Sequence, residues 1–196
     1  MNEHNIYPME LYKNKYRIPS ARAPWWNYAA NGWYFVTSCT QNRECFFGDV
    51  VDGEMRLSGI GRIAHACWLE IPKHFPFVQL DAFVVMPNHV HGIIVIDKPD
   101  EGDLIVGTVE IQELVSPPRI TLGPRNTFGP QSKNLASIIR GFKIGVTKNA
   151  RLIDPGFAWQ SLYHDHIIRD KKSYRNISEY IINNPAKWKK DKWHRT

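Results

Sequence analysis

Two short apolar segments separated by only two residues constrain the fold of this 196-residue chain more than any other feature. Residues 78–86 (VQLDAFVVM) and 89–96 (HVHGIIVI) are rich in β-branched and aromatic side chains, and Pro87-Asn88 between them favours a turn. Because two strands joined by so short a turn lie side by side and run in opposite directions, the sequence predicts an antiparallel β-hairpin here.

Three amphipathic patterns predict helices around the hairpin. From Ile60 to Ile71 the apolar residues recur every three or four positions, as on one buried helical stripe. A second stripe predicts a helix from about Lys133 to Arg151. A third helix is expected to begin after Asp170, a favourable N-cap residue, and to run to about Asn184.

The remaining extended segments complete a known order of elements. Residues 33–40 (WYFVTSCT) predict a first strand, a short strand is expected around 45–51, and residues 157–160 and 162–168 are expected to be extended. The order β, α, β, β, α, β, α predicts a ferredoxin-like (RRM-like) α+β sandwich. Its antiparallel sheet would carry helices on one face, with an additional C-terminal helix.

One globular domain accounts for most of the chain. We expect an N-terminal arm over residues 1–31, a single domain over 32–190 and a basic tail over 191–196. Residues 98–132 contain many prolines and glycines and no periodic apolar pattern, which predicts a surface insert within that domain.

Composition narrows the classes of protein. No apolar run approaches the ~18 residues that a membrane span needs, and the N-terminus has no signal-peptide stretch, so a cytoplasmic protein without a membrane partner is expected. The three cysteines have no C-x-x-C spacing, which argues against a disulfide framework and a cysteine zinc site. A net charge of +6 permits a polyanionic partner without requiring one.

Two H-x-H motifs are candidate metal sites. On a strand, His89 and His91 would project from one face while Val90 enters the core, and two imidazoles make half of a metal site, although such pairs also arise by chance. The pair His164 and His166 could be a competing metal pair, a phosphate contact or a polar edge-strand face. The apolar Val90 favours the first pair, because it ties that strand into a buried sheet.

Tyr180 and Asn184 form a third candidate feature, in the segment EYIINNP. Four residues apart on a helix, they would place a phenol next to an amide oxygen, that is, a potential nucleophile beside a potential metal ligand. The alternative is structural: a tyrosine beside an apolar stripe is usually a boundary residue, and Asn-Asn-Pro commonly ends a helix.

Four segments of the sequence, taken together and in order, indicate a protein family more specifically than any one of them alone. The order VVMPNHVHGIIVI, KNLASIIRGFKIGVTK, WQSLYHDHIIRD and YRNISEYIINNPAKW resembles the single-tyrosine HUH transposases, most closely the REP-associated tyrosine transposases, over about residues 15–190. The resemblance implies that His89 and His91 are the metal-binding pair, that Tyr180 is the catalytic nucleophile and that Asn184 is the third metal ligand.

The resemblance also implies a reaction. With Mg²⁺ or Mn²⁺ on the phosphate oxygens, the tyrosine would attack phosphorus in single-stranded or hairpin DNA, forming a 5′-phosphotyrosine and freeing a 3′-hydroxyl. Because the bond energy is kept, the same enzyme would both nick and rejoin strands without ATP. Some members of the family share the tyrosine across a homodimer, and the sequence leaves this open.

Other residues are candidate DNA contacts. Basic side chains that could meet the DNA backbone are Arg22, Lys133, Arg140, Lys143 and Lys148. Trp25, Trp26 or Trp188 could stack on unpaired bases. Two alternatives stay open: a non-catalytic nucleic-acid-binding module of the same fold, and a His-based metal nuclease that uses water as the nucleophile.

Overall fold

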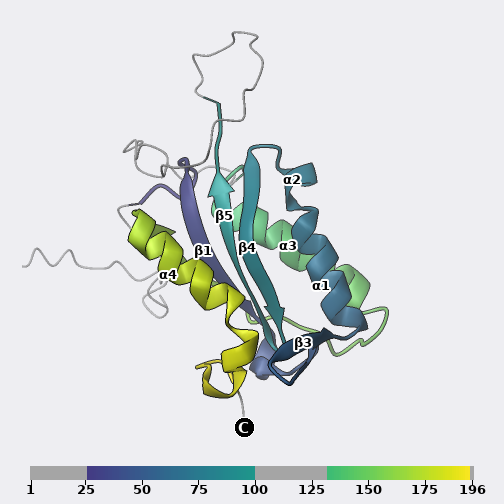
Figure 1. Cartoon of the computed structure of the whole chain (residues 1–196). Helices are drawn as coiled ribbons and strands as arrows, with labels where there is room; N and C mark the ends of the chain where they lie inside the picture. Colours follow the sequence, from purple (N-terminus) through teal and green to yellow (C-terminus); the bar gives the residue numbers. More distant parts are fainter. Residues whose placement is uncertain (1–25, 100–131, 195–196) are drawn as a thin grey trace, which may run out of the picture.

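A four-stranded antiparallel sheet forms the centre of the domain (Figure 1). The structure, a computed structural model, describes residues 26–99 and 132–194. The strand order is β4-β5-β1-β6, and each neighbouring pair is antiparallel. The strands are β1 (Gly32–Cys39), β4 (Val78–Met86), β5 (His89–Ile96) and β6 (His164–Ile168). The expected hairpin is confirmed, with β4 and β5 paired at both ends and a register shift between Leu80 and Phe83.

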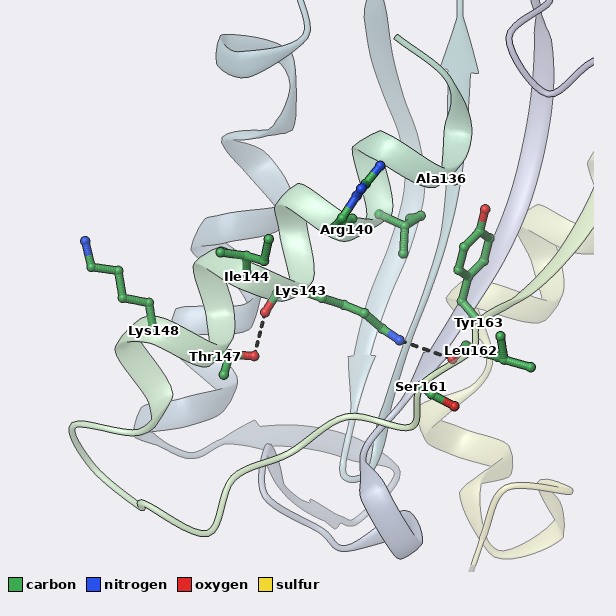
Figure 2. Close-up of a pocket in the computed structure, with 10 residues that line it drawn as sticks. Ala136, Arg140, Lys143, Ile144, Thr147, Lys148, Ser161, Leu162 and Tyr163 are labelled. Carbon is green, nitrogen blue, oxygen red and sulfur yellow. Dashed lines mark hydrogen bonds between the residues drawn. The ribbon is translucent and has the colours of Figure 1, made fainter. Parts of the chain in front are cut away.

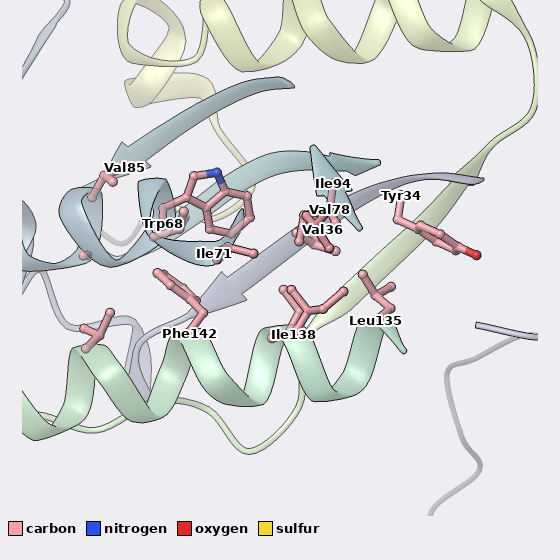
Figure 3. Close-up of a cluster of buried hydrophobic side chains, with 14 of the residues drawn as sticks. Tyr34, Val36, Trp68, Ile71, Val78, Val85, Ile94, Leu135, Ile138 and Phe142 are labelled. Atoms are coloured by element: carbon pink, nitrogen blue, oxygen red, sulfur yellow. The ribbon is translucent and has the colours of Figure 1, made fainter. Parts of the chain in front are cut away.

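Two long helices and a short one cover one face of the sheet and complete the ferredoxin-like α+β sandwich that the sequence predicts. They are α1 (Gly59–Leu69), α2 (Ile71–His74) and α3 (Leu135–Ala150). Figure 3 shows Trp68, Ile138 and Phe142 between the helices and the strands, where all three are at most 3% exposed. Val36 and Ile94 come from the central strands to meet them, so the main core lies on this face.

The C-terminal helix α4 (Lys171–Ile182) lies on the opposite face of the sheet (Figure 1). Asp170 caps it as expected, because its side chain accepts a hydrogen bond from the Ser173 backbone N–H at 2.8 Å. A smaller buried cluster joins this helix to the strands and includes Trp33, Ile93 and Ile181. The helix is followed by the 3-10 helix η3 (Pro185–Lys190). The packing of α4 on this face of the sheet therefore determines where the residues that follow the helix lie.

One hairpin differs from the expectation. The sequence predicts one short strand at 45–51, whereas the structure has two, β2 (Gly48–Val51) and β3 (Glu54–Leu57), paired with each other. Asp52 and Gly53 between them have φ of 53° and 79°. An Asp-Gly pair with both φ values positive is a strong two-residue hairpin signal, and the sequence prediction did not use it.

The ends of the expected domain also differ in their packing. Trp26 and Tyr28 of the expected arm are 7% and 5% exposed and belong to the main core. Trp193 of the expected tail is 6% exposed. Of the predicted extended segment 157–160, only Trp159 forms an isolated bridge, to Thr40. Arg22, Trp25 and most of the insert lie outside the described residues. Within the described ranges, no helix has both the length and the apolar character to cross a membrane.

Gly92 of β5 lets the Trp68 ring pack directly on the sheet, and this gives a stability prediction. A Cβ at position 92 would come within 2.9 Å of Trp68 Cε2 and closer still to Cζ2. We expect Gly92→Ala to lower the free energy of unfolding by about 1–3 kcal/mol, because a fully buried ring has nowhere to move. Urea denaturation measures the change.

A matched control lies on α3. At Gly145 a Cβ would meet Cys67 Sγ at an ordinary 3.5 Å. There the same substitution should leave stability unchanged or raise it by up to about 1 kcal/mol, since alanine favours helix. Equal effects of Gly92→Ala and Gly145→Ala would contradict the packing of Trp68 on Gly92.

Candidate active site

The two histidines of the first H-x-H motif lie at the start of β5, on the face that α4 covers. Their ring centroids are 4.3 Å apart, and the side chains of His89 and His91 are 0% and 1% exposed. Val90 between them lies in the main core on the other face. The alternation of a strand therefore brings both imidazoles to one buried place, as the sequence predicts.

His89 is held in one tautomer by its neighbour. Its Nδ1 lies 2.8 Å from Asn88 Oδ1. The Asn88 amide nitrogen donates to the carbonyl oxygens of Arg43 and Trp193, at 3.2 and 2.9 Å, which fixes its oxygen as the atom that faces the ring. An amide oxygen only accepts, so Nδ1 carries the proton and Nε2 keeps a lone pair. His89 Nε2 is buried and has no hydrogen-bond partner.

His91 joins the sheet to the C-terminal helix. Its Nδ1 lies 2.8 Å from the Thr37 hydroxyl, and its Nε2 lies 3.1 Å from the Tyr180 hydroxyl. Because a threonine hydroxyl both donates and accepts, the ring has two tautomers available. When the Tyr180 hydroxyl donates to Asp191, the His91 Nε2–H donates to Tyr180. In the other tautomer Nδ1–H donates to Thr37, and the Nε2 lone pair can bind a cation.

Asn184 brings an amide oxygen to the same place. α4 ends at Ile182, yet Asn184 keeps helical backbone angles (φ −61°, ψ −44°) and is 1% exposed. Its amide nitrogen donates to Asp191 Oδ2 at 2.8 Å, and its Oδ1 is buried without a partner. His89 Nε2 and Asn184 Oδ1 are thus both buried acceptors without a hydrogen-bond partner, and each costs free energy while it is unpaired.

Tyr180 lies beside these atoms within the same chain. Its hydroxyl donates to Asp191 Oδ2 at 2.9 Å, and its ring contacts His91 and Phe35 at centroid distances of 5.2 and 6.2 Å. Burial, the hydrogen bond to Asp191 and the charge of that carboxylate raise the pKa of Tyr180 well above its ordinary value. The phenol is therefore protonated at rest, and a reaction that uses its oxygen needs an acceptor for the proton.

The electrostatic setting keeps both histidines neutral. Burial, followed by the positive charges of Arg43 and Lys192, lowers the pKa of His89 to about 3. Burial, followed by the neighbouring His89, holds the pKa of His91 well below its ordinary value of 6.5. Neutral imidazole is the form that binds metals.

These lowered pKa values predict a loss of stability in acid. Between the ordinary pKa of 6.5 and the folded value, the unfolded chain takes up protons that folded His89 and His91 refuse, so stability falls as pH falls through that window. In chelator, the free energy of unfolding should decline by about 1.4 kcal/mol per pH unit for each histidine. His89→Gln should reduce this slope in urea denaturation, and the exposed His74→Gln should not; an unchanged slope in His89→Gln would contradict the assignment.

The donor atoms suit a divalent cation. His89 Nε2, His91 Nε2 and Asn184 Oδ1 make a neutral N, N, O set, which suits Mn²⁺ and tolerates Mg²⁺ when phosphate oxygens complete the shell. Two of the three are the orphaned buried atoms, which is the observation that fits a bound cation. No group of three His, Cys, Asp or Glu side chains in residues 26–99 and 132–194 surrounds a metal position, so the amide is needed to complete a set of three.

The basic residues of α3 lie away from this site. α3 packs on the opposite face of the sheet, and Lys133, Arg140 and Lys148 are exposed there. Lys143 instead reaches across a groove of about 770 Å³ to Leu162 (Figure 2). Its ammonium donates to the carbonyl oxygens of Gln160 and Leu162 at 2.7 and 3.1 Å, and burial lowers its pKa to about 8. Lys143 thus links α3 to the segment that leads into β6, and its expected contact with the DNA backbone stays a prediction.

The tryptophans expected to stack on bases are used elsewhere. Trp26 lies in the main core and donates from its indole nitrogen to the Tyr34 hydroxyl at 3.1 Å. Trp188 is 8% exposed, with its ring centroid 5.9 Å from that of His89. Trp26 is therefore a correction to the sequence prediction, and Trp188 covers the histidine pair.

The second H-x-H motif lies on the same face of the sheet as the first but at its edge. In β6, His164 pairs with Thr37 and His166 pairs with Phe35 across the ladder to β1. Both histidines are exposed. The structure therefore does not bring them together with Tyr180 and Asn184 at the buried pair.

Three residues of the site were missed from the sequence: Thr37, Asn88 and Asp191. Asn88 precedes the histidine motif, and its position next to a buried ligand was an available signal. Thr37 and Asp191 gave no signal, because Thr37 meets His91 only through strand pairing and Asp191 returns to Tyr180 only after η3.

Comparison with known proteins identifies a relative in sequence and a solved structure of similar fold. No known family model matches the chain. It is 41% identical over 179 residues to an uncharacterized protein of Haemophilus influenzae, which covers 88% of this chain and 90% of that protein. A solved structure of a REP-associated tyrosine transposase bound to a REP hairpin is similar with a TM-score of 0.53 at 20% identity, over 85% of this chain and 74% of that chain. The fold that the sequence resemblance implied is confirmed.

Proposed function

This chain belongs to the family of the Haemophilus influenzae protein and has the fold of a REP-associated tyrosine transposase, and from this premise we propose that it is a metal-dependent single-tyrosine transposase. Its activity is to nick and rejoin single-stranded or hairpin DNA through a covalent 5′-phosphotyrosine on Tyr180. The neighbour of the same fold is bound to a REP hairpin, which supports hairpin DNA as the substrate class.

One observation carries the proposal. His89 and His91 come from one strand, and Tyr180 and Asn184 come from a distant part of the sequence. His91 Nε2 lies 3.1 Å from the Tyr180 hydroxyl, and Tyr180 and Asn184 both donate to Asp191 Oδ2. Two of the three candidate ligand atoms, His89 Nε2 and Asn184 Oδ1, have no partner. Buried acceptors without a partner are uncommon in folded proteins, and a bound cation would pair these two. A cation held by His89 Nε2, His91 Nε2 and Asn184 Oδ1 would give the two unpaired atoms a partner and would replace the contact between His91 Nε2 and the Tyr180 hydroxyl.

The cation site and the nucleophile have separate roles. His89, His91 and Asn184 hold the ion, which supplies positive charge against the non-bridging oxygens of the scissile phosphate when it is bound. Asn88 and Thr37 orient the two imidazoles from behind. Tyr180 and Phe35 are only partly buried, so the phosphate approaches from the side of these rings.

The chemical step balances without a further reactant. The Tyr180 oxygen forms a bond to phosphorus, the bond from phosphorus to the 3′ oxygen breaks, and the phenol proton passes to the Asp191 carboxylate that already accepts it. The 3′ oxygen takes a proton from water and leaves as a hydroxyl, and Asp191 returns its proton to solvent. Attack by another 3′-hydroxyl on the phosphotyrosine reverses the sequence and joins strands.

The test is covalent trapping with DNA hairpins that carry single-stranded flanks and a label on one end. With Mn²⁺ or Mg²⁺ the protein should form an adduct that resists denaturation and carries the DNA on the 3′ side of the cut, and chelator should abolish it. Cleavage without an adduct would favour a nuclease that uses water. Binding without cleavage would favour a non-catalytic binding module.

Asn88 gives a prediction for metal affinity that does not depend on DNA. Asn88→Ala removes the acceptor that keeps the proton on His89 Nδ1, so Mn²⁺ should bind about 10–100-fold more weakly. Asn88→Asp keeps an oxygen acceptor and should lose less. The free Mn²⁺ signal in electron paramagnetic resonance measures both, and equal affinity in the wild type and Asn88→Ala, with the fold intact by circular dichroism, would contradict the role of Asn88.

A further inference from the structure

A pocket of about 380 Å³ opens beside Tyr180, between the edge strand β6 and the C-terminal residues. Phe35 and Thr37 of β1 line it, and these two residues also contact the site, through the Tyr180 ring and the His91 imidazole. The pocket and the nucleophile are therefore adjacent, and the centroids of the Phe35 and Tyr180 rings are 6.2 Å apart. Its volume lies within the usual range for small-molecule sites, at the lower end.

Aromatic rings and cations make up most of the lining of this pocket, which also includes Asp165 of β6. The Trp193 ring has the Arg43 guanidinium 5.1 Å from its centroid and the Lys192 ammonium 4.9 Å from it. The His164 ring lies 5.0 Å from Trp193, tilted by 48°. Among the described residues, neither Arg43 nor Lys192 forms an ion pair with a carboxylate. Flat rings next to unpaired positive charges are the surface that binds a base and its phosphate together.

The backbone at Arg43 is strained in a way that serves this pocket. Asn42 and Arg43 both have positive φ, 53° and 57°, in the short 3-10 helix η2 (Gln41–Arg43). Positive φ is unfavourable for a non-glycine residue, and such strain is often retained at functional sites. It lets the Arg43 carbonyl accept from Asn88 while the guanidinium lies over Trp193 and donates to the Lys192 carbonyl at 3.4 Å.

We propose that this pocket is a nucleotide subsite, which binds one unpaired deoxynucleotide next to the scissile phosphate. The base stacks on the exposed His164, with the buried Trp193 ring supporting that histidine from behind, and the phosphate of the same nucleotide pairs with Arg43 and Lys192. The second H-x-H motif thus serves the substrate and binds no metal. This inference deepens the proposed function and rests on it, because the pocket takes the strand that Tyr180 attacks.

Histidine signals of the full chain provide a direct test. In protein labelled with ¹³C-histidine and kept in chelator, the dinucleotide pTpT is titrated while the Cε1–H resonances are followed; His164→Ala and His166→Ala assign the two pocket signals. We expect these two signals to shift while that of His74, exposed on α2, stays in place. His164→Ala should weaken binding of pTpT at least about fivefold, the lower limit for loss of one stacking contact.

Two further comparisons make the outcome decisive. Lys192→Ala should weaken binding about as much, whereas Lys189→Ala, exposed in the same segment and outside the pocket, should not. Deoxyribose 5-phosphate, which lacks a base, should shift the pocket signals far less than pTpT. Equal shifts with both probes, or none with pTpT, would overturn the subsite. A covalent adduct with DNA in that case would leave the proposed function standing, and pocket binding without any adduct would refute the proposed function alone.

Discussion

Tyr180→Phe should abolish the covalent protein–DNA adduct while leaving the protein folded and able to bind Mn²⁺. The phenol oxygen is the only atom removed, and it is the atom that would bond to phosphorus. The ring stays packed against Phe35 and the α4 stripe. Loss of its hydrogen bond to Asp191 should cost only about 0.5–1.5 kcal/mol of stability. Denaturing gels with labelled hairpin DNA measure the adduct.

Tyr174→Phe is the matched control for this variant. Tyr174 lies on the same helix, six residues before Tyr180, and its hydroxyl also donates to an aspartate, Asp81, at 2.9 Å. It is on the apolar stripe against Trp33, away from the histidine pair. Tyr174→Phe should keep the adduct at its wild-type level. Adduct formation or DNA cleavage that persists in Tyr180→Phe would remove Tyr180 from the role of nucleophile.

His89→Ala should remove high-affinity Mn²⁺ binding and, with it, adduct formation. The change deletes one of three donor atoms, and loss of an outer-shell partner alone typically costs about 10–100-fold, so a loss of at least 100-fold is expected. Mn²⁺ affinity is measured without DNA, by the free-ion signal in electron paramagnetic resonance, so that the result does not depend on activity. His91→Ala and Asn184→Ala should act in the same direction.

The second histidine pair provides the control for metal binding. His164 and His166 have the same spacing on a strand, and both are exposed at the edge of the sheet. His164→Ala and His166→Ala should leave Mn²⁺ affinity unchanged. If these variants lose the metal and His89→Ala keeps it, the ion binds at the edge pair and the proposed arrangement is wrong.

The parts of the fold and site that sequence predicts are those set by local pattern. Strands 78–86 and 89–96 are found at the predicted residues, because alternation and a two-residue turn leave one register in which the hydrophobic side faces the core. The same alternation placed His89 and His91 on one face. Helical spacing brought Tyr180 and Asn184 to the same end of α4, although Asn184 lies past its last hydrogen-bonded turn.

The parts that sequence did not predict depend on contacts between distant segments. Asp191 looked like part of a basic tail, yet the chain turns back through η3 and its carboxylate meets Tyr180 and Asn184. Lys143 was expected to be a surface cation. A helical pattern predicts the direction of its side chain, but it does not predict that the Gln160 carbonyl oxygen lies within hydrogen-bond distance of the ammonium. Trp26 was expected to lie in an N-terminal arm and to stack on unpaired bases, because only the folded chain brings it to Tyr34.

The most direct test of a phosphotyrosine at the histidine pair is to locate the DNA on the protein by mass spectrometry. Trypsin cuts after Arg175 and Lys187, so Tyr180 falls in the peptide NISEYIINNPAK, separate from the short peptide that contains Tyr174. After reaction with hairpin DNA in Mn²⁺ and nuclease digestion, we expect the mass of a 5′-linked nucleotide on Tyr180 of this peptide. The same mass on another peptide, or cleaved DNA with no modified peptide at all, would contradict it.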